Sequence, residues 1–162
     1  MFENEATGWV QRCVRPLLKA ESCMETDSAK VFLDKAFEEL QLLDVLLTQE
    51  PVAMWIFGFH AQQVAERSLK AALILKRRNP PAKTHDLLQL SEELIEAGEE
   101  VPEWASELDQ LTPFAVRFRY DTIGLVVYLI RRQVRDLVVR IYNWAASIAQ
   151  ARKYEEQAPQ GT

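Results

Sequence analysis

The sequence predicts an all-α fold, an up-and-down bundle of four to five helices in one domain. Apolar residues recur at three- and four-residue steps over long stretches, as they do on one face of a helix. The 162 residues include only 5 Gly and 7 Pro, and no segment has a convincing strand pattern. A composition of 48% hydrophobic and 27% charged residues is that of an ordinary globular protein.

The chain divides into three parts on sequence grounds. Residues 1–26 are predicted to form an N-terminal extension outside the core, at most a short helix, because Pro16 interrupts a weak helical periodicity. Residues 27–155 form the bundle, and residues 156–162 a disordered tail.

The first two helices of the bundle have recognisable starts. Asp27 or Ser28 can cap the first helix, whose apolar positions are Val31, Phe32, Ala36, Leu40, Leu43 and Leu47. Pro51 suits the first turn of the second helix, where a missing N–H costs nothing. That helix runs to about Arg78 and is apolar on more than one side, which predicts a central position in the bundle.

Capping residues also delimit the later helices. Thr84 is the predicted N-cap of the third helix, and Gly98 its stop. A shorter helix is expected from Pro102, ending before the next proline. Asp121 can then cap a long last helix that reaches about Tyr154.

Charge is unevenly distributed along the chain, although the formal net charge is only -5. Residues 86–109 contain nine acidic residues and no basic one, whereas residues 112–153 contain eight basic and two acidic ones. The two faces are either simply solvated, or the basic one, with Lys76, Arg77 and Arg78 nearby, contacts a phosphate or an acidic partner.

The sequence favours a cytoplasmic protein without a membrane span. Cys13 and Cys23 would lie roughly 15 Å apart on one helix, too far for a disulfide, so reduced thiols are expected. No signal peptide is apparent, and the longest near-apolar run, residues 123–130, is far too short to cross a membrane.

Three segments in order carry a family resemblance. They read "FHAQQVAERSLKAALIL", "KTHDLLQL" and "AVRFRYD", and they fall on the second helix, the start of the third and the approach to the last. The chain resembles the HEPN family over roughly residues 28–145. The resemblance implies a four- to five-helix bundle, kinship with the helical domain of kanamycin nucleotidyltransferase and frequent homodimers. It also implies frequent pairing with a small nucleotidyltransferase, as in toxin–antitoxin systems.

The second helix carries a strip of polar residues. With about 100° between successive residues, the strip contains His60, Gln63, Arg67 and Lys70. Glu66 lies beside it and can pair with Lys70 at i, i+4, which by itself would only stabilise the helix.

The functional alternative is a groove for a nucleotide or RNA. Gln63 and Lys70 would face Arg119 and Tyr120 from the last part of the chain, and these groups could hold a base and its phosphate. Arg67 is included in this set, and His60, Glu66 and His85 are possible members. Equally, His60 could be an interfacial histidine, His85 a helix-start residue, and Arg119 the partner of Asp121 or Glu66.

Catalysis is not predicted. Many HEPN proteins are metal-independent ribonucleases that use an Arg and a following His with four to six residues between them, at the start of the last long helix. No histidine follows Arg117 or Arg119 there; Arg78 and His85 have the spacing but straddle a loop. Neither histidine has Glu three residues earlier, as a di-iron bundle site would need, so no metal or cofactor is expected.

The leading hypothesis is therefore a non-catalytic HEPN module that binds a nucleotide, RNA or a partner nucleotidyltransferase as a homodimer. One alternative is a diverged ribonuclease toxin that uses Arg119 with His85 or His60. Another is a structural homodimeric interaction protein, whose last helix would expose Tyr142, Trp144 and Ile148 as anchors.

Overall fold

The structure is a computed structural model that describes the backbone of residues 6–49, 52–77, 83–116 and 131–157. Side chains in these ranges are described from residue 27 onward, except at residues 116 and 156. All regular structure in these ranges is helical, as the sequence predicts. The elements are α1 (Ala6–Thr48), α2 (Met54–Arg77), α3 (Leu87–Glu96), the 3-10 helix η1 (Glu103–Leu111), α4 (Thr112–Val116) and α5 (Arg131–Gln157).

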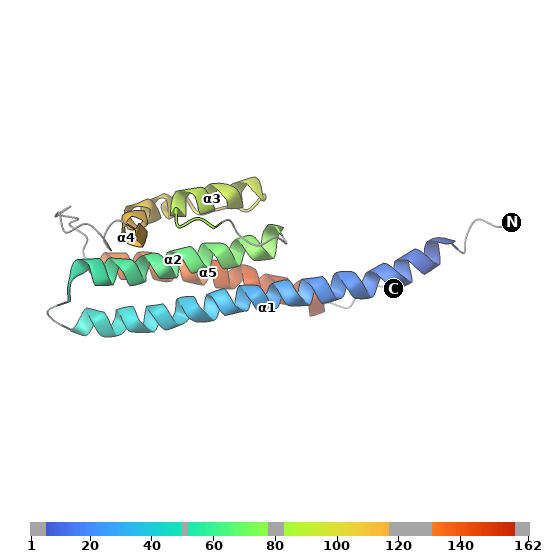
Figure 1. Cartoon of the computed structure of the whole chain (residues 1–162), viewed down its shortest axis with the longest axis horizontal. Coiled ribbons are helices and arrows are strands. Elements are labelled where there is room, and N and C mark those ends of the chain that lie inside the picture. Colours follow the sequence, from blue (N-terminus) through green and yellow to red (C-terminus); the bar gives the residue numbers. More distant parts are fainter. Residues whose placement is uncertain (1–5, 50–51, 78–82, 117–130, 158–162) are drawn as a thin grey trace.

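Three long helices, α1, α2 and α5, lie side by side (Figure 1). The shorter elements α3, η1 and α4 pack on the other side of α2. Helix α2 is therefore central, as its apolar character on several sides predicts. Its buried Phe57, Leu69 and Leu73 meet residues such as Leu43 of α1 and Ile141 of α5 in one hydrophobic core.

The predicted start of the first helix, at Asp27 or Ser28, is wrong. Helix α1 runs without a break from Ala6 and contains Pro16. A proline inside a helix removes one backbone hydrogen bond, but the helix can continue on both sides of it. In Figure 1 the N-terminal part of α1 extends well beyond the rest of the bundle.

At the ends of α3, the predicted N-cap Thr84 is wrong and the predicted stop at Gly98 is confirmed. Asp86, not Thr84, is the N-cap: its carboxylate accepts hydrogen bonds from the amides of residues 88 and 89. The Thr84 hydroxyl accepts instead from the Asp86 amide at 3.1 Å. Gly98 does end the helix, with φ of 81°, because its left-handed backbone lets Glu99 donate back to the Leu94 carbonyl.

The short helix expected from Pro102 is present at the predicted place. It is the 3-10 helix η1, which has Pro102 as its N-cap and ends at Leu111, before Pro113. Helix α4 then begins at Thr112 and contains Pro113 in its first turn, where a proline is tolerated. The predicted cap Asp121 lies outside the described residues, and α5 continues to Gln157 rather than Tyr154.

The predicted exposed anchors of the last helix are partly buried. Tyr142, Trp144 and Ile148 all pack against the hydrophobic core. The Tyr142 ring lies 6.0 Å from that of Phe37 on α1, and Trp144 and Ile148 line a cavity of about 250 Å³. These side chains are therefore committed to the fold of their own chain, which removes the basis for that prediction.

The acidic segment that contains α3 neutralises the end of α2. Arg77 forms ion pairs with Glu93 at 3.1 Å and Glu96 at 2.9 Å, and Lys76 pairs with Glu99 at 2.5 Å. Two of the three basic residues considered as phosphate contacts are thus paired within the chain, and Arg78 lies outside the described residues. In the part of the chain that the structure describes, no helix is long and apolar enough to cross a membrane.

Gly58 allows α4 to approach α2 closely. A Cβ atom at this position would lie 2.4 Å from the ring of Phe114, which is itself buried. This approach places α4, and with it Thr112, beside the start of α3, where the Leu87 amide donates to the Thr112 hydroxyl at 3.3 Å.

We expect Gly58→Ala to lower the free energy of unfolding by about 1–3 kcal/mol, because the methyl group overpacks the contact with Phe114. Urea unfolding measures the change. Adding Phe114→Leu to Gly58→Ala should recover part of the loss. A stability gain of about 1 kcal/mol, which helix propensity alone would give, would contradict the close contact.

Candidate functional site

A buried carboxylate, Glu66, is the centre of a polar cluster on α2. Its side chain is only 8% exposed and accepts hydrogen bonds from three residues. Lys70 Nζ donates to Oε1 at 2.8 Å, and Gln62 Nε2 donates to Oε2 at 2.8 Å. His85 Nδ1 lies 3.0 Å from Oε2 and 3.2 Å from Oε1. The helix thus supplies two of the donors at i−4 and i+4, and the segment before α3 supplies the third.

His85 is held from two sides and remains open to solvent. Its backbone carbonyl accepts from Gln62 Nε2 at 3.3 Å, while its ring faces Glu66 through Nδ1. The His85 side chain is nevertheless 60% exposed. Because Nδ1 must carry the proton to donate to a carboxylate, the Nε2 atom is left for a second partner.

A second carboxylate, Glu39 of α1, extends the cluster to a neighbouring helix. Gln63 Nε2 donates to Gln62 Oε1 at 2.7 Å, and Arg67 donates to Gln63 Oε1 at 3.1 Å. Arg67 also donates to Glu39 Oε1 at 2.7 Å, and His60 Nδ1 lies 2.6 Å from the other Glu39 oxygen. Lys70 and His60 are therefore the two ends of one hydrogen-bonded chain of side chains.

Electrostatics keep Glu66 ionised. Burial is the largest single effect and raises the pKa of the Glu66 carboxyl. The hydrogen bonds from Lys70, Gln62 and His85 together lower that pKa by more than burial raises it. The net result is a Glu66 pKa below the ordinary value for glutamate. A charged carboxylate at this position holds its three donors more firmly than a neutral one would.

The structure brings together six of the eight candidate residues: Gln63, Arg67, Lys70, His60, Glu66 and His85. The other two, Arg119 and Tyr120, lie outside the described residues. The Glu66–Lys70 ion pair expected from sequence is present at 2.8 Å. His60 is a partly buried histidine between α2 and α1, 22% exposed, and His85 lies just before the N-cap of α3.

Two members of the cluster, Gln62 and Glu39, are not among the site residues predicted from the sequence. Gln62 is fully buried and donates both to the Glu66 carboxylate and to the His85 carbonyl, and its i, i+4 spacing to Glu66 could have revealed it. Glu39 had no such local signal, because it reaches Arg67 and His60 from a different helix. In the ranges that the structure describes, no group of three His, Cys, Asp or Glu side chains is placed to hold a metal ion.

Comparison with known families decides the relationship of the chain. A family model described as "HEPN domain" matches residues 29–144, well over half of the sequence. The chain belongs to the HEPN family. The match includes the whole Glu66 cluster and both Arg119 and Tyr120, whereas the N-terminal half of α1 precedes it. Searches of curated proteins and of solved structures found no match.

We predict that Glu66→Gln lowers the free energy of unfolding by about 3 kcal/mol at neutral pH, because it leaves the Lys70 ammonium buried without its counter-charge. The folded-state pKa of Glu66 is depressed, so its stabilising effect is complete above the unfolded pKa of about 4.3 and is lost as the pH falls through the lower folded value. The difference between wild type and variant should therefore shrink in acid.

Urea unfolding across a pH series measures this difference. Glu92→Gln is the matched control, since Glu92 is exposed on α3 and should change stability little at any pH. A Glu66→Gln effect that stays the same size in acid would show that the ionised carboxylate does not hold the cluster.

Proposed function

We propose that this HEPN protein is a non-catalytic binding module for a nucleotide or RNA, and that the ligand is met at the surface around His85. The observation that supports this site most directly is the ring of His85, exposed to solvent yet held in one orientation by the buried Glu66. A side chain fixed before binding loses little entropy when a ligand arrives.

The other members of the cluster act behind this surface. The side chains of Lys70 and Arg67 are already paired with Glu66 and Glu39 and are 11% and 25% exposed. In the proposed site, Gln63, Arg67 and Lys70 therefore position Glu66 and the loop of His85 rather than contact phosphate themselves. Exposed Lys83, two residues before His85, adds a cation that could meet a phosphate.

Arg119 and Tyr120 would complete the site with a phosphate contact and an aromatic platform for a base. Their inclusion rests on the sequence motif, because both residues lie outside the described ranges. We propose binding without catalysis because no histidine follows Arg117 or Arg119 with four to six residues between them.

A ribonuclease is the second candidate function, because His85 and Glu66 also resemble an oriented general base. A carboxylate at Nδ1 leaves Nε2 to accept a proton from a ribose hydroxyl, and Arg119 could stabilise the charge that develops on the phosphate. A nucleotidyltransferase partner stays a prediction that rests on the family resemblance alone.

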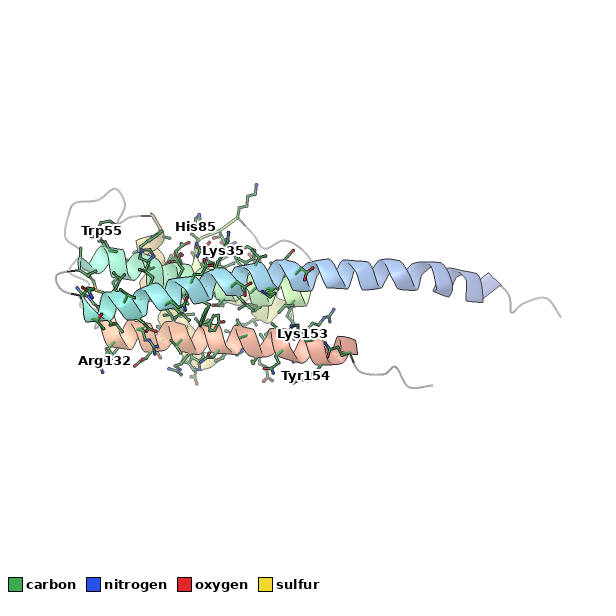
Figure 2. The ribbon with its side chains drawn as sticks, turned by 90° about the horizontal axis from the view of Figure 1, so that it is seen from below. Lys35, Trp55, His85, Arg132, Lys153 and Tyr154 are labelled. Atoms are coloured by element: carbon green, nitrogen blue, oxygen red, sulfur yellow. The ribbon has the colours of Figure 1, made fainter. Side chains whose placement is uncertain are left out.

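We expect His85→Ala and Arg119→Ala each to weaken binding about tenfold, as the loss of one charge-assisted or ring contact would do. Fluorescence anisotropy with a labelled single-stranded RNA, and competition by ATP and GTP, measure the affinity. Lys153→Ala is the control, because it removes an exposed cation near the C-terminal end of α5 (Figure 2).

The same mixtures, run on a denaturing gel with EDTA present, separate the two candidates. Intact RNA and weakened binding by both variants would support the binding module. Cleavage that His85→Ala abolishes would favour the ribonuclease instead. Equal affinity of wild type, His85→Ala and Arg119→Ala would exclude the proposed site.

A further inference from the structure

Helix α1 carries two stripes on opposite sides. The inner stripe packs against α2 and α5 and consists of buried residues: Ala29, Leu33, Ala36, Leu40 and Leu43. A second set, here called the outer stripe, is shifted by two residues along the helix and so points about 200° away. Its members are Val31, Lys35, Glu38, Leu42 and Val45.

The outer stripe is open to solvent although much of it is apolar. Val31 is 52% exposed, Leu42 37% and Val45 55%. Lys35 and Glu38 are exposed between them, and neither side chain has an ion-pair partner among the described residues. In Figure 2, α1 lies nearest the viewer with no drawn helix in front of it, and Figure 1 shows the same side as the lower edge of the bundle.

The spacing of the outer stripe is that of a helix-pairing seam. Its residues follow one another at steps of four, three, four and three, which is the heptad pattern of a coiled coil. Single exposed apolar side chains are common on protein surfaces, but three on one seam with two opposite charges between them are better explained by a second helix.

The charges in the middle of the stripe identify that helix and its direction. A parallel pair of α1 helices in register would place Lys35 against the partner's Lys35, and Glu38 against the partner's Glu38. An antiparallel pair centred between residues 36 and 37 instead places Lys35 opposite the partner's Glu38, twice by symmetry. The same register places Val31 opposite the partner's Leu42. Four of the five stripe residues therefore face the same stripe of the other copy, as a two-fold interface requires, and Val45 lies opposite the partner's Ser28.

We infer that the outer stripe of α1 is the self-association surface of this protein, and that two copies pair there with antiparallel α1 helices. Residues 25–48 of each copy overlap in this register, a length of about 36 Å of helix. One helix pair of this length buries less surface than an obligate dimer, so the dimer dissociates on dilution. The inference is independent of the ligand proposed above.

A charge-reversal series tests both the surface and the direction of the helices. Analytical ultracentrifugation of the full chain gives the dimer dissociation constant for wild type, Lys35→Glu, Glu38→Lys and the doubly reversed variant. Each single change turns two attractive pairs into two repulsive ones and should raise the constant about tenfold. The doubly reversed variant restores both attractive pairs and should return to the wild-type value.

Matched controls make the same charge changes elsewhere. Glu92→Lys on α3 and Lys153→Glu on α5 alter exposed residues and should leave the constant unchanged. Leu42→Glu, which places a charge in the seam, should abolish the dimer while circular dichroism shows a folded protein.

A wild-type protein that stays monomeric at the highest concentration reached, or a dimer that Leu42→Glu leaves intact, would overturn the proposed surface. A dimer that Leu42→Glu dissociates, but that neither single charge reversal weakens, would overturn the antiparallel arrangement. Loss of dimer without loss of RNA binding would leave the His85 site standing.

Discussion

The arrangement of this bundle depends on a buried carboxylate that has to stay paired. Glu66 lies in the middle of the central helix, where an isolated charge would be strongly unfavourable. Lys70, Gln62 and His85 satisfy it together, and only the first two come from its own helix. The pairing therefore ties the segment before α3 to α2, and the depressed pKa of Glu66 shows that these donors outweigh the effect of burial.

The same network determines which groups a ligand can meet. Its cations are paired within the chain: Lys70 with Glu66, and Arg67 with Glu39. The polar strip of α2, which the sequence suggests is a row of free donors, is thus paired within the chain and holds the cluster in place. The exposed ring of His85 is the part of the cluster that faces solvent. Membership of the HEPN family fixes neither ligand nor chemistry, so the proposed function rests on the geometry of this site.

The sequence predicts those contacts and helix ends that depend on local spacing. The Glu66–Lys70 pair follows from i, i+4 geometry, and Gly98 from its position after a periodic segment. Prediction from sequence fails where two neighbouring residues could both cap a helix, or where the partner of a side chain is distant in sequence. Thr84 and Asp86 were both able to cap α3, and only the geometry of the loop selects Asp86.

Most of what the sequence does not predict consists of contacts between residues that are distant along the chain. Glu39 approaches Arg67 and His60 from α1, and His85 approaches Glu66 across 19 residues, without any signal in the local pattern. The continuation of α1 through Pro16 was also missed, because a proline usually marks an end. The outer stripe of α1 was hidden for a related reason: periodicity shows that a face is apolar but not which helix covers it.

The most direct measurement is the protonation of the His85 ring, observed by nitrogen-15 NMR in the wild-type protein. Under conditions where the ring is neutral, a bond to the Glu66 carboxylate requires the proton on Nδ1, with Nε2 unprotonated. We predict that tautomer. A neutral His85 ring that carries its proton on Nε2 would contradict the account, because the buried carboxylate would then not hold the one side chain on which the proposed site depends.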